Sequence, residues 1–484
     1  MLSRFLDSCE SEQLHLSGAI QPHGTLLLLD GQGRLSHVAA NVEAFLGYKP
    51  EALLGRPLPD QLAALAVEVG DTPGSRRLNE RTIDGVHGPL DVVVIRGEQN
   101  RIILELTQHL ATGVSQPAIW SMPEPLANDI LVAQEHLLRR IADLTGFQRV
   151  MFYSFHNDGD GEVVGEIRQG NAYGSYLGLR FPASDIPQIA RTLYLKNPWR
   201  LIPDATADSV PVLGREAVIP DLTWSDLRSV SPIHQVYLAN MGVRASLSFP
   251  VIVGRSLAAL IAAHHSEVRH LSPALLEYAA MLVRNHAFAL TAWHSQRRMR
   301  LLDGLNQHFD LIQGLLHRYG NIVDAWPESA VTLMEAFQAD GAILCLDGIQ
   351  AHAGEGFEPP ALAAFDDWFC YQQSDFVWIG DSLSRQVPDF PLSKIAGVAA
   401  LRLKSRDGSW LRIYLCRLEH VCEVTWGGNP DKPVEYHDGK VGIAPRRSFE
   451  KWVEKRLGYC RGWDNETRLL ALKLRDLLYR EFRP

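Results

Sequence analysis

The sequence has few cysteines, and no two of them form a close pair. Six are present and none belongs to a Cys-x-x-Cys motif, which excludes a zinc ribbon built on such pairs. Five lie in the last third of the chain, mostly among apolar residues, where cysteine is usually a small buried hydrophobe. The sixth, Cys9, lies among serines and glutamates. Its surroundings alone indicate a solvated thiol on a polar tail.

No stretch is apolar for long enough to cross a membrane as a helix. The most apolar stretch, 245–263, is interrupted by Pro250 and Arg255 and is rich in strand-forming residues, so it predicts a hairpin. The N-terminus is too charged for the apolar region of a signal peptide, since Arg4 and Asp7 already interrupt it. These absences predict a cytoplasmic protein with no membrane partner.

Positive charge is in the minority, and catalytic signatures are missing. The chain has 47 Lys and Arg against 56 Asp and Glu, a formal net charge of -9. No long basic stripe with interleaved aromatics is present, so a nucleic-acid partner is not expected. Nucleotide fingerprints, a phosphate-binding loop and nucleophile–base motifs are also missing, so no enzymatic activity is expected of this chain.

What remains is the composition of a globular protein with several domains. The 484 residues are 46% hydrophobic and 21% charged, enough for more than one core. At about 150 residues per domain, the length predicts roughly three domains.

The first segment, 1–115, predicts an α+β domain. Apolar runs of strand length alternate with short helical stretches. The predicted strands are 25–29, 90–95 and 101–106, and the predicted helices are 42–46 and 60–67. A connector rich in Gly and Pro follows at 112–127.

Two later segments repeat one order of elements, a helix, a strand and a hairpin, which predicts two related units in tandem. In the first unit these are a helix at 129–144, a strand at 149–155 and a hairpin from 241–248 to 258–263. In the second they are a helix at 329–338, a strand at 342–346 and a hairpin from 396–403 to 410–415.

A long helical tract joins the two units. Ser272 predicts the N-cap and Pro273 the first helical residue, and apolar spacing continues to Leu316. The alternative is two helices with a break near Asp303 and Gly304. A helix this long often packs against a second copy of itself, so it predicts a homodimer.

Several short strings follow one another along the chain. They are Cys9 with Ser17–Gly24, Arg180–Pro187, Arg228–His234, Tyr237–Val243, His264–His265, Trp426–Pro430 and Pro445–Glu450. In this order they closely resemble the PAS–GAF–PHY photosensory core of bacterial phytochromes, and the resemblance covers nearly the whole chain.

The resemblance implies a fold class and a set of domains. The fold is α+β, with three tandem sensor domains, each an antiparallel sheet flanked by helices, joined by a helical spine. The limits are 1–115 for the PAS domain with its tail, 126–293 for the GAF domain and 305–484 for the PHY domain. The PHY domain carries a tongue at about 420–460. The PAS–GAF interface is knotted, with Ile20 at the crossing.

The resemblance also implies a bilin chromophore, and the cysteines indicate which one. Plant and cyanobacterial relatives attach the bilin to a cysteine directly before the histidine that matches His234, where this chain has Ile233. The bacterial form uses a cysteine ahead of the PAS domain, which is Cys9. Biliverdin has a vinyl group to which a thiolate can add, so biliverdin IXα linked to Cys9 by a thioether is expected.

The resemblance assigns roles inside the GAF pocket. Arg200 and Arg228 pair with the bilin carboxylates, because a guanidinium matches a carboxylate bidentately. The backbone oxygen of Asp185 and the ring of His234 lie near the pyrrole nitrogens, and His264 bonds the carbonyl of ring D. Hydroxyl groups and the walls of the pocket come from Tyr194, Ser246, Ser248, Met151, Tyr153, Phe181, Tyr237, Ile186 and Ser231.

The tongue is the implied switch. Residues 446–457 have helical spacing, yet the family shows this arm as a hairpin in one light state. The resemblance implies that Asp185 pairs with Arg446 in one state and bonds Ser448 in the other. The chain would then be a red/far-red photoreceptor that relays light to a missing output module, such as a histidine kinase acting with a response regulator.

Two departures and several alternatives stay open. Ala258-Ala259 and Leu415-Cys416 replace residues that the family usually has, which affects packing between the GAF and PHY units. A small-molecule sensor without pigment and an enzyme acting on a tetrapyrrole are the competing functions. A hairpin turn is preferred over a calcium loop at 158–162, and a metal site at His264 and His265 is disfavoured because adjacent strand residues point to opposite faces.

Overall fold

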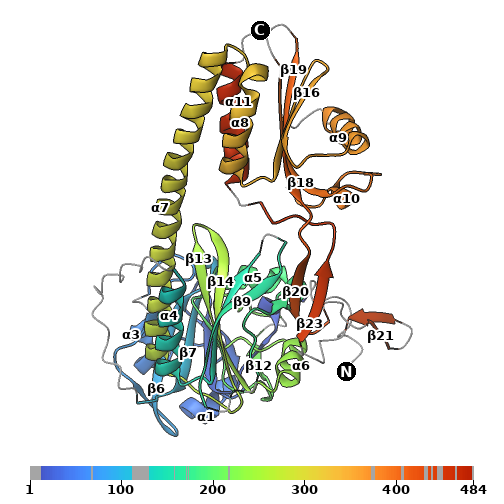
Figure 1. Ribbon diagram of the computed structural model, residues 1–484. Coiled ribbons are helices and arrows are strands. Elements are labelled where there is room, and N and C mark those ends of the chain that lie inside the picture. The colour runs from blue at the N-terminus through green and yellow to red at the C-terminus, as the bar shows by residue number, and fades with distance from the viewer. Residues whose placement is uncertain are drawn as a thin grey trace. The chain divides into compact units, whose positions relative to one another are not determined.

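The computed structural model describes most of the chain, shown in Figure 1. The described residues are 12–66, 69–111, 130–156, 158–170, 172, 174–215, 218–371, 376–404, 408–429, 434–437, 440–443, 451–463 and 466–481. They form two compact units: Met1–Ala292 with Thr425–Trp452, and Trp293–Val424 with Val453–Pro484. Cys9, Arg446 and Ser448 lie outside the described residues.

The first sheet of the first unit has the strand order β1-β12-β3-β2-β7-β6-β4, with β5 paired to β6. The strands are β1 (Ala19–Ile20), β2 (Gly24–Leu29), β3 (Leu35–Ala39), β4 (Arg76–Leu78), β5 (Ile83–Gly85), β6 (Gly88–Arg96), β7 (Ile102–Gln108) and β12 (Val210–Gly214). Helices α1 (Val42–Leu46), α2 (Pro50–Leu53) and α3 (Asp60–Ala66) close a core on one face. The strands and helices expected in this segment are confirmed.

Strand β1 is held on both sides by residues that come about 200 positions later. Its Ile20 pairs with Val210 of β12 on one edge and forms a bridge with Arg228 on the other. Ser229 N donates to Ala19 O at 3.0 Å. Ile20 is fully buried in a core that joins strands of the first sheet to Leu222 and Leu227. These are the contacts expected of Ile20 at a chain crossing.

The second sheet has the order β11-β13-β14-β8-β9-β10-β20-β23. Its strands are β8 (Arg149–Phe155), β9 (Gly161–Arg168), β10 (Arg180–Phe181), β11 (Arg200–Ile202), β13 (Ala245–Val253), β14 (Ser256–His265), β20 (Cys422–Gly427) and β23 (Lys451–Arg456). Helix α4 (Ile130–Thr145) packs on β8 and β9, while α5 (Gln188–Tyr194) and α6 (Pro232–Asn240) supply residues to a pocket. The predicted helix, strand and hairpin of this unit are confirmed.

The tongue segment is extended where it is described. Residues 451–456 form strand β23, and β21 (Val434–His437) pairs with β22 (Lys440–Ile443). Strand β20 lies parallel to β10 through Trp426 and Arg180. Of the two conformations that the sequence allows, the described residues therefore adopt the strand.

The sheet of the second unit has the order β16-β15-β19-β18-β17. Its strands are β15 (Gly341–Leu346), β16 (Ile349–Gly354), β17 (Val377–Gly380), β18 (Ile395–Lys404) and β19 (Trp410–Leu418). Helices α8 (Ile322–Phe337) and α11 (Thr467–Glu481) bury one face, and α9 (Pro359–Tyr371) and α10 (Leu383–Gln386) bury the other.

Helix α8, which precedes β15, begins earlier than the sequence predicted. It starts at Ile322 and not at Ser329. The cause is a cap, because Asn321 Oδ1 accepts a hydrogen bond from Asp324 N at 2.9 Å. Pro327 then lies inside the helix, where it removes one backbone donor without ending it.

The helical tract is one helix, α7 (Pro273–Tyr319), with no break near Asp303 and Gly304. Its predicted cap is confirmed, since Ser272 Oγ accepts a hydrogen bond from Leu275 N at 3.2 Å.

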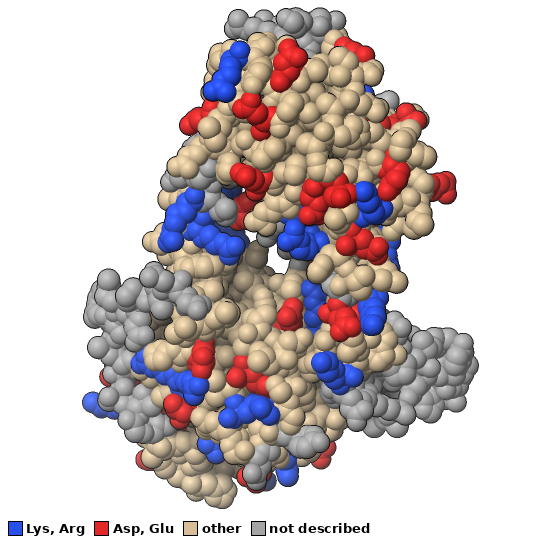
Figure 2. Space-filling view, viewed as in Figure 1, with Lys and Arg blue, Asp and Glu red and all other residues tan. Residues whose placement is uncertain are grey.

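Among the described residues no helix combines the length and the apolar character needed to cross a bilayer. Figure 2 shows acidic and basic side chains interspersed over the visible face.

Candidate functional site

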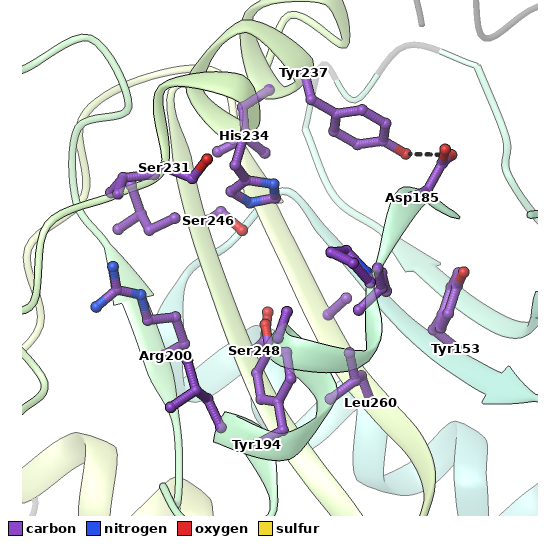
Figure 3. A pocket seen from close by; sticks show the side chains of 18 of the residues that line it. Tyr153, Asp185, Tyr194, Arg200, Ser231, His234, Tyr237, Ser246, Ser248 and Leu260 are labelled. Atoms are coloured by element: carbon purple, nitrogen blue, oxygen red, sulfur yellow. Dashed lines mark hydrogen bonds between the residues drawn. The ribbon is translucent and has the colours of Figure 1, made fainter. Parts of the chain in front are cut away.

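One pocket on the second sheet gathers every bilin-site residue named from the sequence that the structure describes. Figure 3 shows its lining from close by. The predicted residues in the lining are Met151, Tyr153, Phe181, Asp185, Ile186, Tyr194, Arg200, Arg228, Ser231, His234, Tyr237, Ser246, Ser248 and His264. They are spread over more than 100 positions of sequence, and the fold brings them together.

Strand alternation builds the floor of the pocket. In β14, Leu260, Ala262 and His264 face the pocket at every second position, as the two-residue period of a strand requires. The neighbouring β13 adds Ser246 and Ser248 in the same way. His265 lies on the other face, where its Nδ1 accepts a hydrogen bond from Glu267 N at 3.0 Å. The predicted separation of the two histidines is therefore confirmed.

Aromatic rings form an apolar wall. Phe181 lies 6.0 Å from the ring of Tyr153 and 6.1 Å from that of Tyr176. Gly161 leaves room for Tyr153, because a Cβ there would approach its ring carbons to about 2 Å. Such a wall suits a flat conjugated ligand.

Two arginines, Arg228 buried and Arg200 half-buried, give the pocket a cationic end. Arg200 donates to the backbone carbonyls of Asp226 and Ser229 at 3.0 and 2.9 Å. Arg228 donates to those of Leu222 and Thr223 at 3.3 and 3.2 Å. Burial and the nearby Arg228 lower the pKa of Arg200 to about 9, and burial also lowers the pKa of Arg228. In the described part of the chain these guanidinium groups donate to carbonyls and not to carboxylates, so an anionic ligand would relieve their repulsion.

Three buried polar atoms of the lining have no hydrogen-bond partner among the described residues. They are Asn197 Oδ1, Trp199 Nε1 and His264 Nδ1. Leaving such a group unsatisfied costs about 1–3 kcal/mol, so most buried polar groups find a partner. A ligand with its own donors and acceptors would supply these partners.

The two pocket histidines are neutral at pH 7. Burial, with Arg200 nearby, lowers the pKa of His234 to about 4. Burial, with Arg149 and His234 nearby, lowers the pKa of His264 to about 3. Each ring therefore offers one N–H donor and one acceptor nitrogen.

Asp185 ends a short 3-10 turn (Ala183–Asp185) at the pocket wall. Tyr237 Oη donates to its Oδ2 at 3.2 Å, as the dashed line in Figure 3 marks. The ring of Tyr237 stacks on that of His234 with centroids 6.0 Å apart. The expected exchange between Arg446 and Ser448 involves residues outside the described part of the chain.

The N-terminal tail contributes to the pocket lining. Glu12 and Leu14 line the pocket, and Ser231 Oγ donates to Glu12 Oε2 at 2.7 Å. Cys9 precedes Glu12 by only three residues. It lies outside the described residues.

Sequence reasoning missed several lining residues. They include Glu12, Tyr176, Asn197, Trp199, Leu260 and Ala262. Alternation from His264 would have found Leu260 and Ala262, whereas no local pattern marks the others.

The turn at 158–162 is a hairpin turn, as expected, in which Asp158 Oδ1 accepts from Asp160 N at 3.0 Å. No cluster that could hold a metal ion occurs among the described residues.

Family models match three consecutive regions of the chain. A model described as PAS fold matches residues 9–107, one described as GAF domain matches 129–290, and one described as Phytochrome region matches 296–483. The three matches follow the order that the sequence motifs had indicated.

Curated relatives match over nearly the whole chain. A bacteriophytochrome of Pseudomonas aeruginosa is 31% identical and cyanobacterial phytochrome B of a Nostoc species is 30% identical, each over 98% of this chain. The chain spans 66% of the length of both relatives.

Solved structures agree with these matches. The wild-type phytochrome photosensory core module of Stigmatella aurantiaca superposes with a TM-score of 0.83 at 29% identity, covering 98% of both chains. A bacteriophytochrome from the photosynthetic bacterium R. palustris gives 0.80 at 27% identity, covering 96% of this chain and 97% of its own. With its PAS, GAF and PHY domains in order, the chain belongs to the phytochrome family of photoreceptors and corresponds to the bacterial photosensory core.

Proposed function

We propose that this chain binds biliverdin IXα covalently through Cys9 and switches with light between a red-absorbing and a far-red-absorbing state. The observation that carries the proposal is that one pocket gathers the expected residues, with two arginines at one end and, elsewhere, polar atoms that have no partner among the described residues. A bilin has two carboxylates, polar ring nitrogens and carbonyls, and a flat conjugated body, and it supplies light absorption and an isomerisable double bond.

The residues of the pocket divide the work of binding. Arg200 and Arg228 bind the carboxylates, with hydroxyl groups from Tyr194, Ser246 and Ser248 beside them. His264 bonds the carbonyl of ring D, and the Asp185 backbone oxygen and His234 serve the ring nitrogens. The aromatic wall with Met151 excludes water from the ring that moves.

The position of the tail supports Cys9 as the attachment residue. Glu12 lines the pocket, and three extended residues span at most about 11 Å. No cysteine occurs in the proposed GAF domain, 126–293, and Ile233 excludes the alternative attachment position. The thiolate of Cys9 would add to one vinyl carbon as the π bond of the vinyl group opens, and the neighbouring carbon would take up a proton to give a thioether.

The proposal extends to signalling. The PAS domain (1–115) carries the tail, and the PHY domain (305–484) carries the tongue (about 420–460). Asp185 exchanges Arg446 for Ser448 as the tongue changes conformation. The change passes along α7 in a homodimer to an output module, such as a histidine kinase with its response regulator.

The test is assembly of the apoprotein with biliverdin. We expect a covalent adduct by mass spectrometry of the denatured chain, with red and far-red absorption bands that interconvert on illumination. Cys9→Ser should abolish the adduct, while Cys370→Ser, which removes an exposed cysteine, should leave it unchanged. An adduct that survives Cys9→Ser contradicts the attachment, and a colourless protein supports a pigment-free sensor.

A further inference from the structure

A buried cluster of charges connects the first sheet to the cationic end of the pocket. Arg76 of β4 and Asp226 form a bidentate ion pair, with side chains only 10% and 16% exposed. The Arg76 guanidinium also lies 4.6 Å from the ring centroid of Trp199, which lines the pocket. The two partners of the ion pair are 150 residues apart in sequence.

Glu105 of β7 holds the same segment from the first sheet. Its Oε1 accepts hydrogen bonds from Ser225 Oγ at 2.5 Å and from Leu227 N at 3.2 Å. The side chain is buried, and burial together with the nearby Asp226 raises the pKa of Glu105. Burying the three ionisable side chains of Arg76, Asp226 and Glu105 costs desolvation free energy. This cost indicates that their arrangement has a role beyond stability.

The segment 222–229 carries the carbonyls that orient both pocket arginines. Arg200 donates to the carbonyls of Asp226 and Ser229, and Arg228 to those of Leu222 and Thr223. Side chains of the first sheet bond residues 225–227 on one side, and the pocket guanidinium groups bond the backbone on the other. A shift of this segment would therefore turn Arg200 and Arg228 away from a ligand.

We propose that Glu105 and the Arg76–Asp226 ion pair are positioning residues for carboxylate recognition: they fix segment 222–229 and, through its carbonyls, aim Arg200 and Arg228 at the carboxylates of the bilin. This inference rests on the proposed function. Strands β4 and β7 of the first sheet then contribute to ligand selection without touching the ligand. The ion pair also keeps the Asp226 carboxylate occupied, so that it does not compete with the ligand for Arg200.

The test compares two probes, biliverdin and its dimethyl ester, which lacks both carboxylate charges. Binding is followed by quenching of tryptophan fluorescence in a Cys9→Ser background, where attachment does not obscure the equilibrium. The measured quantity is the ratio of the two affinities, which reports carboxylate recognition and not overall stability. We expect the parent chain to prefer the diacid.

Arg76→Met and Asp226→Asn should each lower this preference by about tenfold, the effect of losing one charged hydrogen bond. The double variant should lose no more than either single variant, because the two residues act as one unit. Arg76→Lys should recover part of the preference, and Glu105→Gln should reduce it less than Arg76→Met does.

The matched control is Arg96→Met. Arg96 is a second buried arginine of the first sheet, but it bonds Gly70, Asn100 and Val69 and not segment 222–229. Its removal should lower stability and leave the preference intact. Folded Arg76→Met and Asp226→Asn chains with the parent's preference would overturn the inference alone. Failure of every chain to bind either probe would overturn the proposed function as well.

Discussion

The second sheet of the first unit, here the GAF sheet, and the sheet of the second unit, here the PHY sheet, share one strand order. They differ in what covers one face. Reading β11-β13-β14-β8-β9 beside β17-β18-β19-β15-β16 gives the same order with the same antiparallel pairings. Helices cover the outer face of both sheets. The other face carries the pocket in the GAF sheet and a packed aromatic core in the PHY sheet.

The strand registers identify the residue that makes this difference. Arg149 at the start of β8 pairs with His264, and Gly341 at the start of β15 pairs with Cys416. Two residues back along the partner strand lie Ala262 in the GAF sheet and Tyr414 in the PHY sheet. A methyl group therefore stands over the pocket where the other sheet has a phenol ring.

Tyr414 belongs to the aromatic core, in which its ring contacts Phe365 and Phe369. It is fully buried, its ring lies 5.2 Å from that of Phe365 in an edge contact, and its hydroxyl donates to Asp366. The difference shows that the strand order fixes where a pocket can form, and that side-chain volume at a few inward positions decides whether it forms.

Exchanging that side chain should have the largest effect. Ala262→Tyr places a phenol ring in the GAF pocket, and we expect biliverdin binding to fall at least a thousandfold, measured by absorption titration. Ala262→Ser is the control, because it adds one atom and should still bind. A tyrosine variant that assembles normally would disprove the equivalence of the two positions.

The reverse exchange should destabilise the second unit. Tyr414→Ala leaves a cavity under α9, and deleting a buried aromatic ring costs about 3–5 kcal/mol. Thermal unfolding should show a lower transition for the unit that contains Tyr414, while assembly with biliverdin in the first unit is retained. Tyr414→Phe removes only the hydrogen bond to Asp366 and should cost about 1–3 kcal/mol. Equal losses for the two variants would argue against a packing role.

The smallest effect concerns acid. The pKa of His264 is lowered to about 3 from 6.5. Below pH 6.5, His264 is therefore protonated in the unfolded apoprotein and stays neutral in the folded apoprotein. Stability of the first unit should fall as pH falls from about 6.5, by up to about 1.4 kcal/mol per pH unit for this group. His264→Gln should reduce the slope in apoprotein melts between pH 7 and 5 by the share of this group, because the lowered pKa values of His234 and His286 keep a dependence of the same sign. His265→Gln, on the opposite face, serves as the control, and a dependence unchanged by His264→Gln would refute the assignment.

Much of the fold followed from local patterns in the sequence. Helix α1 and strand β8 have the predicted limits, because apolar period and flanking residues are local signals. Helix α8 was misjudged because Pro327 followed by Ser329 resembles a helix start, while the true cap is Asn321.

The site was predictable only in part. Its residues came from motif resemblance, and strand alternation could have added Ala262. Nothing local links Arg76 to Asp226 or Glu12 to Ser231, because these pairs join segments that are 150 and 219 residues apart. Such contacts depend on the tertiary fold, and a single sequence carries no sign of them.

Strand β1 is synthesised long before the residues that pair with it. Its neighbours in the finished sheet are β12 and the segment around Asp226, which lies 205 residues after Gln21. At a ribosomal rate of about 5–20 residues per second, the first strand waits roughly 10–40 s for the residues that enclose it. During that interval Ile20 lacks the residues that pair with it on its two edges, Val210 and Arg228. The N-terminal domain is therefore made first and completed late, so chaperones that bind nascent chains have the greatest opportunity there.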